Sequence, residues 1–298
     1  MSYLALSKPI NAIPSERTVE QTDQTWDRLA LMTGITDPSA EAARLEGISL
    51  MFRNRGREGT LVLDDVDFSI AKGEFLAVVG PSGCGKTTIL HMLAGLLKPT
   101  LGKVSIDGRE VDGPSKKIGY MLARAGLSPW RTARRNVELG LEIQRVARAQ
   151  RRETATRLLQ QVGLERYADH YPSQLSQGMR QRVAIARTLA LEPEIILMDE
   201  PFAALDAQTR LSVQAQFMTL WERSRPTVVF VTHDLEEAIL LADRVLVMTH
   251  GPSTVKAQMD VRFARPRHIA NLRFDSEFLK AQHDLWAALR EEIEDAPK

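Results

Sequence analysis

The sequence predicts an α/β domain built around a mostly parallel β-sheet, and two observations support this prediction. Short apolar runs typical of buried strands recur along the chain, at residues 75–79, 195–198, 228–231 and 245–248. Stretches of helical character separate these runs, and strands that alternate with helices are typical of a parallel sheet. Because 44% of the residues are hydrophobic, the 298-residue chain can bury a sizeable core.

The N-terminal part of the chain is predicted to contain an extension followed by a strand, a helix and a hairpin. Residues 1–43 form the extension, because Pro, Ser, Thr and Gln are frequent near its start, and a short helix is expected at residues 26–32. Apolar and polar residues alternate over 65–70, as in a half-buried strand. A helix is expected over residues 86–97, and Asp107–Gly108 is a hairpin signal.

The middle and the end of the chain are predicted to be helical. Residues 131–168 carry apolar stripes at helical spacing. The tail ends in an amphipathic helix, whose apolar face is more typical of a core or subunit contact than of catalysis. The residues near this face are Phe278, Leu285, Trp286, Leu289 and Ile293.

Charge, cysteine content and hydropathy restrict the class of protein. The 39 Lys and Arg residues nearly balance the 38 Asp and Glu residues, so bulk charge gives no indication of nucleic-acid binding. Cys84 is the one cysteine, so no intrachain disulfide forms and nothing indicates an oxidising compartment. No apolar run approaches the roughly 18–20 residues of a membrane-spanning helix, and residues 1–18 lack the features of a signal peptide. We therefore expect a cytoplasmic protein that acts at a membrane only through partners.

A phosphate loop follows the first buried strand. Residues 80–88 fit the pattern G-x-x-x-x-G-K-[ST] between an apolar strand and a helix. Glycines let backbone N–H groups turn inward around phosphate oxygens, and the helix N-terminus adds positive potential. Lys86 would reach the β- and γ-phosphates, and the Thr87 hydroxyl would hold Mg²⁺. The candidate nucleotide-binding residues are Gly80, Pro81, Ser82, Gly83, Cys84, Gly85, Lys86, Thr87 and Thr88.

This loop alone leaves kinases, GTPases and many ATPases open, so the ends of two further strands matter. Asp199 and Glu200 end one apolar strand; Asp199 can hold Mg²⁺, and Glu200 can act as the general base for an attacking water. His233 follows another strand and would contact the γ-phosphate and orient the water. Open α/β sheets bind ligands at the carboxyl ends of their strands, so these residues and Lys86 are predicted to form one site.

Further segments resemble the ABC ATPases. Leu175–Arg182, which reads LSQGMRQR, resembles the ABC signature, usually written LSGGxxQR, and lies upstream of the acidic pair at the spacing of that family. Ala204–Asp206 resembles the D-loop, and Phe52 sits where the family places an aromatic ring to stack on adenine. Together with the phosphate loop and His233, this ordered set is highly specific. The chain is identified as a member of the ABC ATPases over residues 45–248.

The resemblance implies a fold and a domain organisation. It implies a P-loop NTPase (RecA-like) core with a mostly parallel sheet, an antiparallel β subdomain and an inserted helical subdomain. The nucleotide-binding domain would span residues 44–258, with the helical subdomain at about 124–180. Residues 259–298 would form a C-terminal tail that contains the amphipathic helix.

The resemblance also implies how such a chain works. ATP and Mg²⁺ would be the cofactors, and two copies would form a homodimer with two ATP molecules sandwiched between them. Ser176, Gln177 and Gly178 open a helix predicted from Met179 to Leu191, and a helix N-terminus with a hydroxyl group is an anion site. In ABC proteins this segment faces the nucleotide of the other subunit, and Asp206 of the D-loop lies nearby.

The partners that the resemblance implies are two transmembrane permease subunits and, indirectly, a solute-binding protein. The chain would then lie on the inner face of the cell membrane. Gln177, the segment 127–132 and the segment 243–252 resemble the nitrate, sulfonate and taurine importers. This likeness implies a small oxyanion or a related organic solute. Trp130 and its surroundings, residues 123–132 with the helix that follows, would form the surface that contacts the permease.

One position departs from the family. Ala123 stands where ABC ATPases have the glutamine of the Q-loop, which helps to ligate Mg²⁺. Alanine offers no oxygen, so either Mg²⁺ takes water there, or the neighbouring Arg124 contacts phosphate, or coupling is weaker. Because Lys86, Asp199, Glu200 and His233 are all present, we expect reduced but real turnover. A regulatory cassette that hydrolyses little ATP is also consistent with Ala123.

Three further classes of protein fit the sequence less well. ABC ATPases that act on nucleic acid or ribosomes usually carry two cassettes or a coiled-coil insertion, whereas this chain has one phosphate loop and no heptad run. A single-chain exporter needs membrane-spanning segments. A metabolic kinase with a phosphate loop has no need of the signature at Leu175–Arg182.

Overall fold

The computed structural model describes residues 41–52 and 59–294. The chain divides into a unit of residues 1–38 and a unit of residues 39–298. The first unit, which includes the helix predicted at 26–32, lies outside the described residues.

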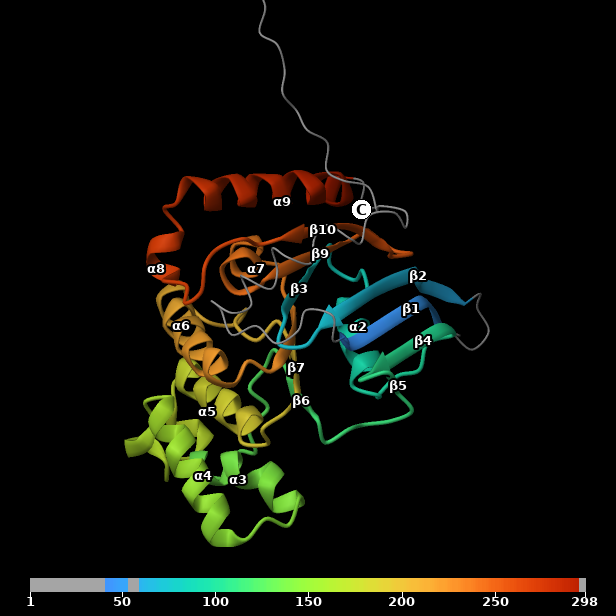
Figure 1. Cartoon of the computed structure of the whole chain (residues 1–298). Coiled ribbons are helices and arrows are strands. Elements are labelled where there is room, and N and C mark those ends of the chain that lie inside the picture. The colour runs from blue at the N-terminus through green and yellow to red at the C-terminus, as the bar shows by residue number, and fades with distance from the viewer. Residues whose placement is uncertain (1–40, 53–58, 295–298) are drawn as a thin grey trace, which may run out of the picture. The chain divides into compact units, whose positions relative to one another are not determined.

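Two sheets form the framework of the second unit (Figure 1). The larger sheet has six strands in the order β10-β9-β3-β8-β7-β6, in which β10 pairs antiparallel with β9 and the other pairs are parallel. Its strands are β3 (Phe75–Val79), β6 (Ile118–Met121), β7 (Ile195–Asp199), β8 (Thr227–Val231), β9 (Arg244–Met248) and β10 (Val255–Asp260). The smaller sheet is antiparallel, in the order β2-β1-β4-β5. Its strands are β1 (Glu41–Phe52), β2 (Thr60–Ala71), β4 (Leu101–Ile106) and β5 (Arg109–Glu110).

The helices complete the α/β arrangement. Figure 1 shows α3, α4 and α5 in the lower part of the molecule and α9 along its upper edge. Their bounds are α2 (Lys86–Leu93), α3 (Ala133–Ile143), α4 (Arg148–Gln161), α5 (Gln177–Leu189), α6 (Ala207–Ser224), α7 (Leu235–Leu241), α8 (Ile269–Leu272) and α9 (Ser276–Glu294). Two short 3₁₀ helices, η1 (Glu165–Tyr167) and η2 (Pro172–Gln174), precede α5. The predicted fold class, with its antiparallel β subdomain and helical insertion, is confirmed.

The structure corrects two predicted helix boundaries. The helix expected over residues 86–97 ends at Leu93, because the chain turns at Gly95, which has φ of 70°. A side chain at Gly95 would lie 2.2 Å from the carbonyl oxygen of Gly113, so only glycine fits this turn. The helix predicted from Met179 begins at Gln177 and ends at Leu189. The hairpin signal Asp107–Gly108 is confirmed, with positive φ at both residues.

The larger sheet is buried on both faces. Side chains of Phe75, Ala77 and Val79 face one apolar cluster with Val183 and Phe217 of α5 and α6. Their neighbours Leu76 and Val78 face a second cluster, which α2 and the smaller sheet complete. This explains why the central strands read as continuous apolar runs. Polar residues therefore first appear where these strands end.

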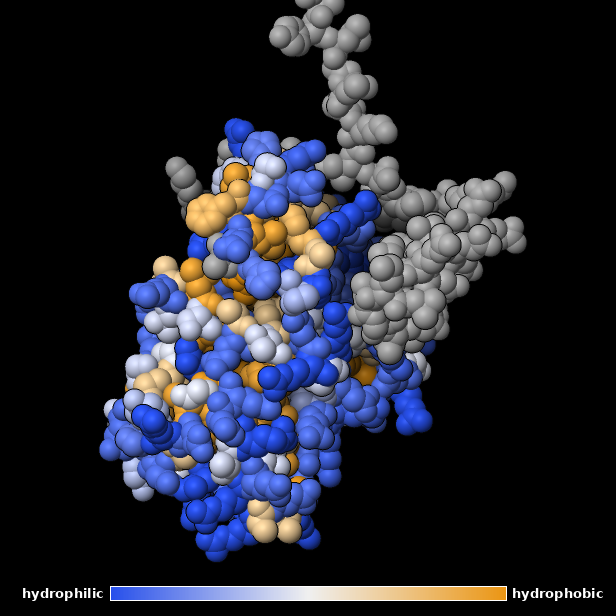
Figure 2. Space-filling model, turned by 60° about the vertical axis from the view of Figure 1, so that its left-hand side comes forward, coloured by the Kyte–Doolittle hydropathy of each residue, from blue (hydrophilic) through white to orange (hydrophobic). Residues whose placement is uncertain are grey.

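The C-terminal tail packs on this domain through α9, which contacts α7 and β10. Phe278, Leu285 and Leu289 are buried, whereas the Trp286 side chain is 47% exposed. The side chain of Ile293, the remaining residue of the predicted apolar face, lies outside the described residues. Figure 2 shows a mostly hydrophilic face with an apolar area in its upper part. In the tail, Phe274 and Leu279 are exposed. Among the helices of the described segments, none is both long and apolar enough to cross a bilayer.

Candidate nucleotide site

The phosphate loop connects β3 to α2, and its conformation depends on glycine. Gly85 has φ of 95°, and a side chain there would lie 2.8 Å from a methyl carbon of Leu63. Gly83 has φ of 79° with open space around it. The Lys86 ammonium group donates hydrogen bonds to the carbonyl oxygens of Gly80 at 2.9 Å and Pro81 at 2.8 Å. The lysine therefore lies across the loop that it belongs to.

The interior of the loop is closely packed. Cys84 is buried, and its sulfur lies 3.7 Å from the Lys86 nitrogen. A side chain at Gly80 would lie 3.0 Å from this sulfur and from Met248 of β9. Cys84 therefore fills the small space under the loop.

Thr87 and Asp199 bring the phosphate loop to the end of β7. The Thr87 hydroxyl lies 3.1 Å from each carboxylate oxygen of Asp199. Burial raises the pKa of Asp199 above its usual value, with a smaller contribution from the charge of Glu200, while the Thr87 hydrogen bond opposes the shift. Hydroxyl and carboxylate oxygens are ligands that Mg²⁺ accepts, so this pair fits the predicted metal. Within the described residues no group of three or more His, Cys, Asp and Glu side chains could hold a metal ion.

Glu200 and His233 meet at the ends of β7 and β8. The Nδ1 atom of His233 lies 3.3 Å from a carboxylate oxygen of Glu200. Glu200 has φ of 45°, a left-handed conformation that is uncommon for glutamate, and its N–H donates to the carbonyl oxygen of Val231. Such conformations cluster at functional sites. The chain thus turns just past the end of β7, where Glu200 contacts His233.

The signature segment and the D-loop form a second group. The Ser176 hydroxyl caps α5 by accepting a hydrogen bond from the Met179 N–H at 3.2 Å. A side chain at Gly178 would lie 2.3 Å from the Thr209 methyl group, so the starts of α5 and α6 are in contact. Asp206 caps α6 by accepting from the Thr209 N–H, and backbone hydrogen bonding lowers the pKa of this carboxyl group.

The predicted site residues therefore fall into two groups. Lys86, Thr87, Asp199, Glu200 and His233 lie together at the carboxyl ends of β3, β7 and β8. Across the described segments, no hydrogen bond or ion pair joins the signature segment to the phosphate loop of the same chain. Phe52 ends β1 with its side chain 43% exposed.

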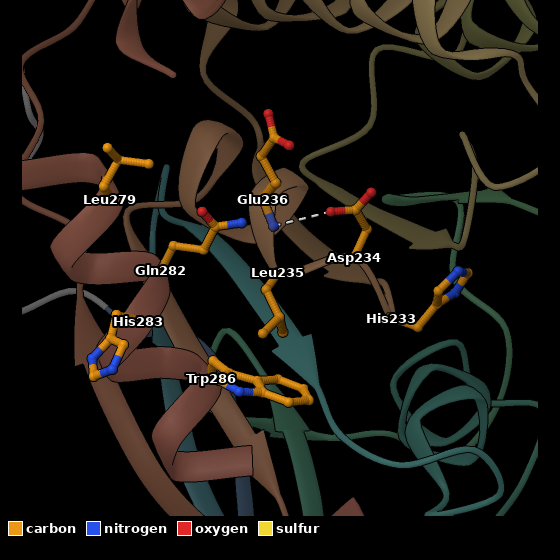
Figure 3. Close-up of a pocket in the computed structure, with 8 residues that line it drawn as sticks. All are labelled: His233, Asp234, Leu235, Glu236, Leu279, Gln282, His283 and Trp286. Carbon is orange, nitrogen blue, oxygen red and sulfur yellow. Dashed lines mark hydrogen bonds between the residues drawn. The ribbon is translucent and has the colours of Figure 1, made fainter. Parts of the chain in front are cut away.

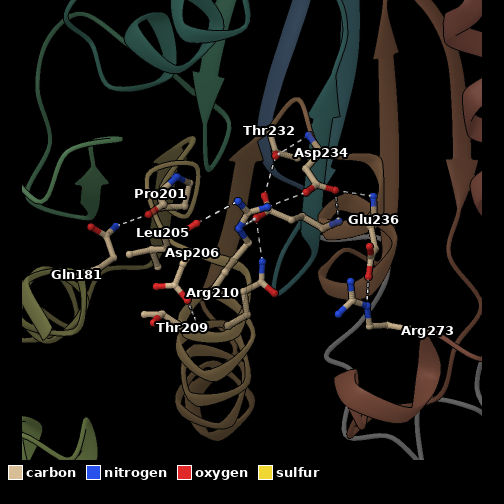
Figure 4. Close-up of polar contacts among 12 residues, drawn as sticks. Gln181, Pro201, Leu205, Asp206, Thr209, Arg210, Thr232, Asp234, Glu236 and Arg273 are labelled. Carbon is tan, nitrogen blue, oxygen red and sulfur yellow. Dashed lines mark hydrogen bonds and ion pairs between the residues drawn. The ribbon is translucent and has the colours of Figure 1, made fainter. Parts of the chain in front are cut away.

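Sequence analysis missed residues that join these groups. Gln181 of α5 donates a hydrogen bond to the carbonyl oxygen of Pro201, next to Glu200. Arg210 of α6 forms an ion pair with Asp234, next to His233, as Figure 4 shows. The acidic residues after His233 carry a helix-start signal that could have found the Asp234 cap. No local signal links Arg210 to Asp234, because 24 residues separate them.

The segment around Ala123 lines a cavity of about 420 Å³ with the signature segment and the D-loop. Arg187 of α5 donates hydrogen bonds to the carbonyl oxygens of Ala125 at 2.8 Å and Gly126 at 2.7 Å. Burial lowers the pKa of Arg187. The backbone of this segment is therefore fixed by Arg187, although Ala123 supplies no polar side chain.

A cavity of about 600 Å³ separates the start of α7 from α9. Figure 3 shows Trp286 of α9 extending toward Leu235, with His233 farther along the same wall. The cavity is lined by His233, Asp234, Leu235, Glu236, Leu279, Gln282, His283 and Trp286. Glu236 forms an ion pair with Arg273, just before α9. The tail thus contacts the helix that follows His233.

The fold and the first group of residues define a P-loop ATPase of the cassette class. The ABC transporter family profile matches residues 63–203. The chain is 45% identical to an uncharacterised ABC transporter ATP-binding protein of Methanocaldococcus jannaschii, over 84% of this chain and 92% of that protein. It is 43% identical to the taurine import ATP-binding protein of Pseudomonas aeruginosa, over 78% of this chain and 90% of that protein. The chain belongs to the ATP-binding proteins of the ABC transporter family, and it is an ABC-type ATPase.

Solved structures agree with this assignment. A bacterial ABC transporter cassette, solved as a dimer in a post-hydrolysis state with ADP and phosphate, has a TM-score of 0.66 and 35% identity. It covers 74% of this chain, which spans its whole length. A protein from Clostridium perfringens, described as part of the transporter complex cbiONQ, has a TM-score of 0.68 at 24% identity over 83% of this chain and 99% of that one, which supports the fold.

Proposed function

We propose that this chain is the ATP-hydrolysing subunit of an ABC importer, in which ATP-driven dimer closure and hydrolysis move a small solute through separate membrane subunits. The observation that carries the proposal is the convergence of Lys86, the Thr87–Asp199 contact and the Glu200–His233 contact at one edge of the sheet. Ligands of open α/β sheets bind at this edge.

Each residue of this group has a proposed role. Lys86 contacts the β- and γ-phosphates, and the backbone of residues 80–85 surrounds them. Glu200 accepts a proton from the attacking water, and His233, 3.3 Å from Glu200, orients that water beside the γ-phosphate. Thr87 and Asp199 would hold Mg²⁺, which when bound supplies positive charge to the phosphate oxygens. The exposed ring of Phe52 stacks on adenine.

The second group supports a homodimer. The N-terminus of α5, where Ser176, Gln177 and Gly178 lie, favours negative charge. Within the described residues, these three make no polar contact with the phosphate loop of their own chain. We assign them, with Asp206 of the D-loop, to the nucleotide bound by a partner copy. A related cassette has been solved as a dimer. Two ATP molecules would then join the two copies.

The membrane partners are assigned to the segment after β6. Leu122 is 50% exposed, Trp130 is 76% exposed and Ile143 at the end of α3 is 75% exposed. Large exposed apolar side chains around one segment favour a protein contact. We propose that two permease subunits bind here, which places the chain at the inner face of the cell membrane. In this proposal residues 44–258 form the nucleotide-binding domain between an extension and a tail.

The proposed solute is taurine, nitrate, a sulfonate or a related small solute. Taurine import ATP-binding proteins are 41–43% identical to this chain. The solute would be selected by a solute-binding protein and by the permease subunits. Transport of radiolabelled taurine by vesicles that contain this chain with its permease partners tests this assignment, and uptake of nitrate instead would correct it.

A hydrolysis-poor regulatory cassette is the second candidate, and Ala123 is the observation that favours it. The Ala123 side chain has no oxygen for a metal or phosphate-bound water. We propose turnover that is reduced but real, because Lys86, Asp199, Glu200 and His233 are all present, with Thr87 in contact with Asp199 and Glu200 in contact with His233. Ala123→Gln should raise the steady-state ATPase rate severalfold. An unchanged rate would mean that this segment works without the glutamine.

The deciding experiment compares the ATPase activity of the full chain with that of Glu200→Gln, while light scattering follows ATP-dependent dimerisation. We expect hydrolysis by the wild type and a persistent ATP-bound dimer of the variant. A Glu200→Gln variant that hydrolyses ATP at the wild-type rate would show that Glu200 is not the general base. A wild-type chain that neither hydrolyses ATP nor dimerises would favour the regulatory cassette.

A further inference from the structure

Arg210 occupies a bridging position between the D-loop and the loop that carries His233. It lies in the first turns of α6, shortly after Asp206. Its guanidinium group donates to the carbonyl oxygen of Leu205 at 3.1 Å and to a carboxylate oxygen of Asp234 at 3.0 Å (Figure 4). One rigid side chain thus contacts both loops at once.

Asp234 is fixed on several sides. One of its carboxylate oxygens caps α7 by accepting from the N–H groups of Glu236 at 3.0 Å and Glu237 at 3.2 Å. The other oxygen accepts from Arg210. Its own N–H donates to the Thr232 hydroxyl at 3.0 Å. Because Asp234 directly follows His233, the orientation of this residue determines the path of the backbone through the histidine.

Buried contacts fix the other side of the histidine. The Thr232 hydroxyl donates to one carboxylate oxygen of Glu237 at 2.7 Å, and Gln214 of α6 donates to the other at 2.9 Å. Thr232, Glu237 and Gln214 are each at most 4% exposed. Arg210 lies one turn before Gln214, so α6 provides two donors to this network.

His233 itself depends on these neighbours. Its side chain is 63% exposed, and in the described part of the chain its ring has one polar contact, with Glu200. A ring with so few contacts of its own is placed by its backbone. Of the residues on either side of it, Asp234 contacts α6 directly through Arg210. Thr232 is linked to α6 indirectly, because it donates to Glu237, which Gln214 of α6 also contacts.

We propose that Arg210 is a positioning residue that ties the D-loop to His233 through Asp234, so that a displacement of the D-loop displaces the histidine. The proposal rests on the proposed roles of Glu200 and His233 in hydrolysis. In the proposed dimer the D-loop faces the partner copy. Arg210 would then couple the arrival of the partner to the placement of the water-orienting histidine. An ordinary exposed ion pair would have no such effect, since such pairs contribute little.

The first test is Arg210→Lys in the full chain. Lysine keeps the charge but lacks the planar fork that serves both acceptors. Since misplacement of a catalytic group by about 1 Å can cost up to about 10²-fold, we expect kcat to fall about 10- to 100-fold. The KM for ATP should change by less than the kcat. Arg223→Lys, on the exposed last turn of α6, is the matched control and should keep the wild-type kcat. A wild-type kcat for Arg210→Lys would overturn the proposal.

The second test does not require hydrolysis. The chain has six histidines, and the His233 imidazole signal is assigned by its loss in His233→Gln. We expect the chemical shift of this signal to change in Arg210→Lys and in Asp234→Asn, but not in Arg223→Lys. An unchanged His233 chemical shift in a folded Arg210→Lys or Asp234→Asn protein would overturn the proposal. If the wild type hydrolyses no ATP, the proposed function fails, while this measurement still decides the role of Arg210.

Discussion

The phosphate loop and the signature segment both open a helix, yet the two helix starts are held differently. α2 follows Gly85 in the left-handed region and has no side-chain cap. α5 follows Ser176, whose hydroxyl accepts from the Met179 N–H. The first N–H groups of a helix lack intrahelical partners. At α2 they are therefore left to an anion, whereas at α5 one is already satisfied by the protein.

The two helix starts also differ in the residues that surround them. The start of α2 contacts Asp199 through Thr87, and Glu200, which follows Asp199, contacts His233. The start of α5 packs against α6 through Gly178 and Thr209. This difference fits the proposal that the first group binds and hydrolyses ATP and that the second group contacts the nucleotide of the partner copy.

The largest expected effect is the loss of ATPase activity when Glu200 or His233 is replaced. Each of Glu200→Gln and His233→Gln should lower kcat by about 10²–10⁴-fold, the usual range for a general base and its positioning partner. Because the two side chains are in contact, the double variant should be little worse than the weaker single variant. Single-turnover ATPase measurements on the three variants check this, and effects that multiply would show that the residues act independently.

The next effect concerns the buried carboxyl group that supports the His233 loop. Burial raises the pKa of Glu237 from 4.5 to about 7. The folded state therefore holds this proton more tightly than the unfolded state, and the resulting stability is complete below about pH 4.5 and lost as the pH rises to about 7. Relative to Glu237→Gln, the wild-type free energy of unfolding should fall by up to about 3 kcal/mol over this window.

Urea unfolding of both proteins at pH 5, 6 and 7 measures this difference. Glu292→Gln is a control in which the pKa shift has the opposite direction, because the His250 N–H and Lys256 lower the pKa of Glu292. The stabilisation by Glu292 is present above the pKa that its carboxyl group has in the unfolded state. It is lost as the pH falls through the pKa of this group in the folded state. A pH-independent difference for Glu237→Gln would contradict the assigned shift.

A smaller effect tests the packing of the signature segment. Gly178→Ala places a methyl group 2.3 Å from Thr209, so either α5 or α6 must move. We expect a loss of about 1–3 kcal/mol in stability, as for overpacked sites, and weaker ATP-dependent dimerisation. Gly113→Ala is the control, because a side chain there meets nothing within 4 Å. Equal dimerisation of both variants would show that Gly178 is not part of the dimer surface.

The smallest effect separates the Ser176 cap from its proposed role. Ser176→Ala and Thr132→Ala each remove the side-chain cap of a helix, at α5 and α3 respectively, and each should cost about 1 kcal/mol. Only Ser176→Ala should also weaken ATP-dependent dimerisation in a Glu200→Gln background, measured by light scattering. Similar dimerisation of Ser176→Ala and Thr132→Ala would show that Ser176 acts only as a structural cap.

Strand prediction succeeded where burial is complete. β3, β7, β8 and β9 are buried on both faces, so their sequences are apolar except at strand ends, where Asp199, Thr227 and Arg244 lie. β6 and β10 were not predicted, because they lie at the edges of the sheet and carry partly exposed residues. An edge strand has a neighbour on one side only, and its sequence pattern is correspondingly weaker.

The sequence by itself determined the phosphate loop, the acidic pair and the signature segment, because each is contiguous and its backbone follows from local residue types. Glycine permits the turn, and serine or aspartate caps the helix that follows. Only the tertiary structure decided that Thr87 meets Asp199, that Glu200 turns toward His233 and that Arg210 reaches Asp234. These contacts join the ends of different strands and helices. They depend on strand order and helix packing, which are set by the burial of the whole core and not by any single segment.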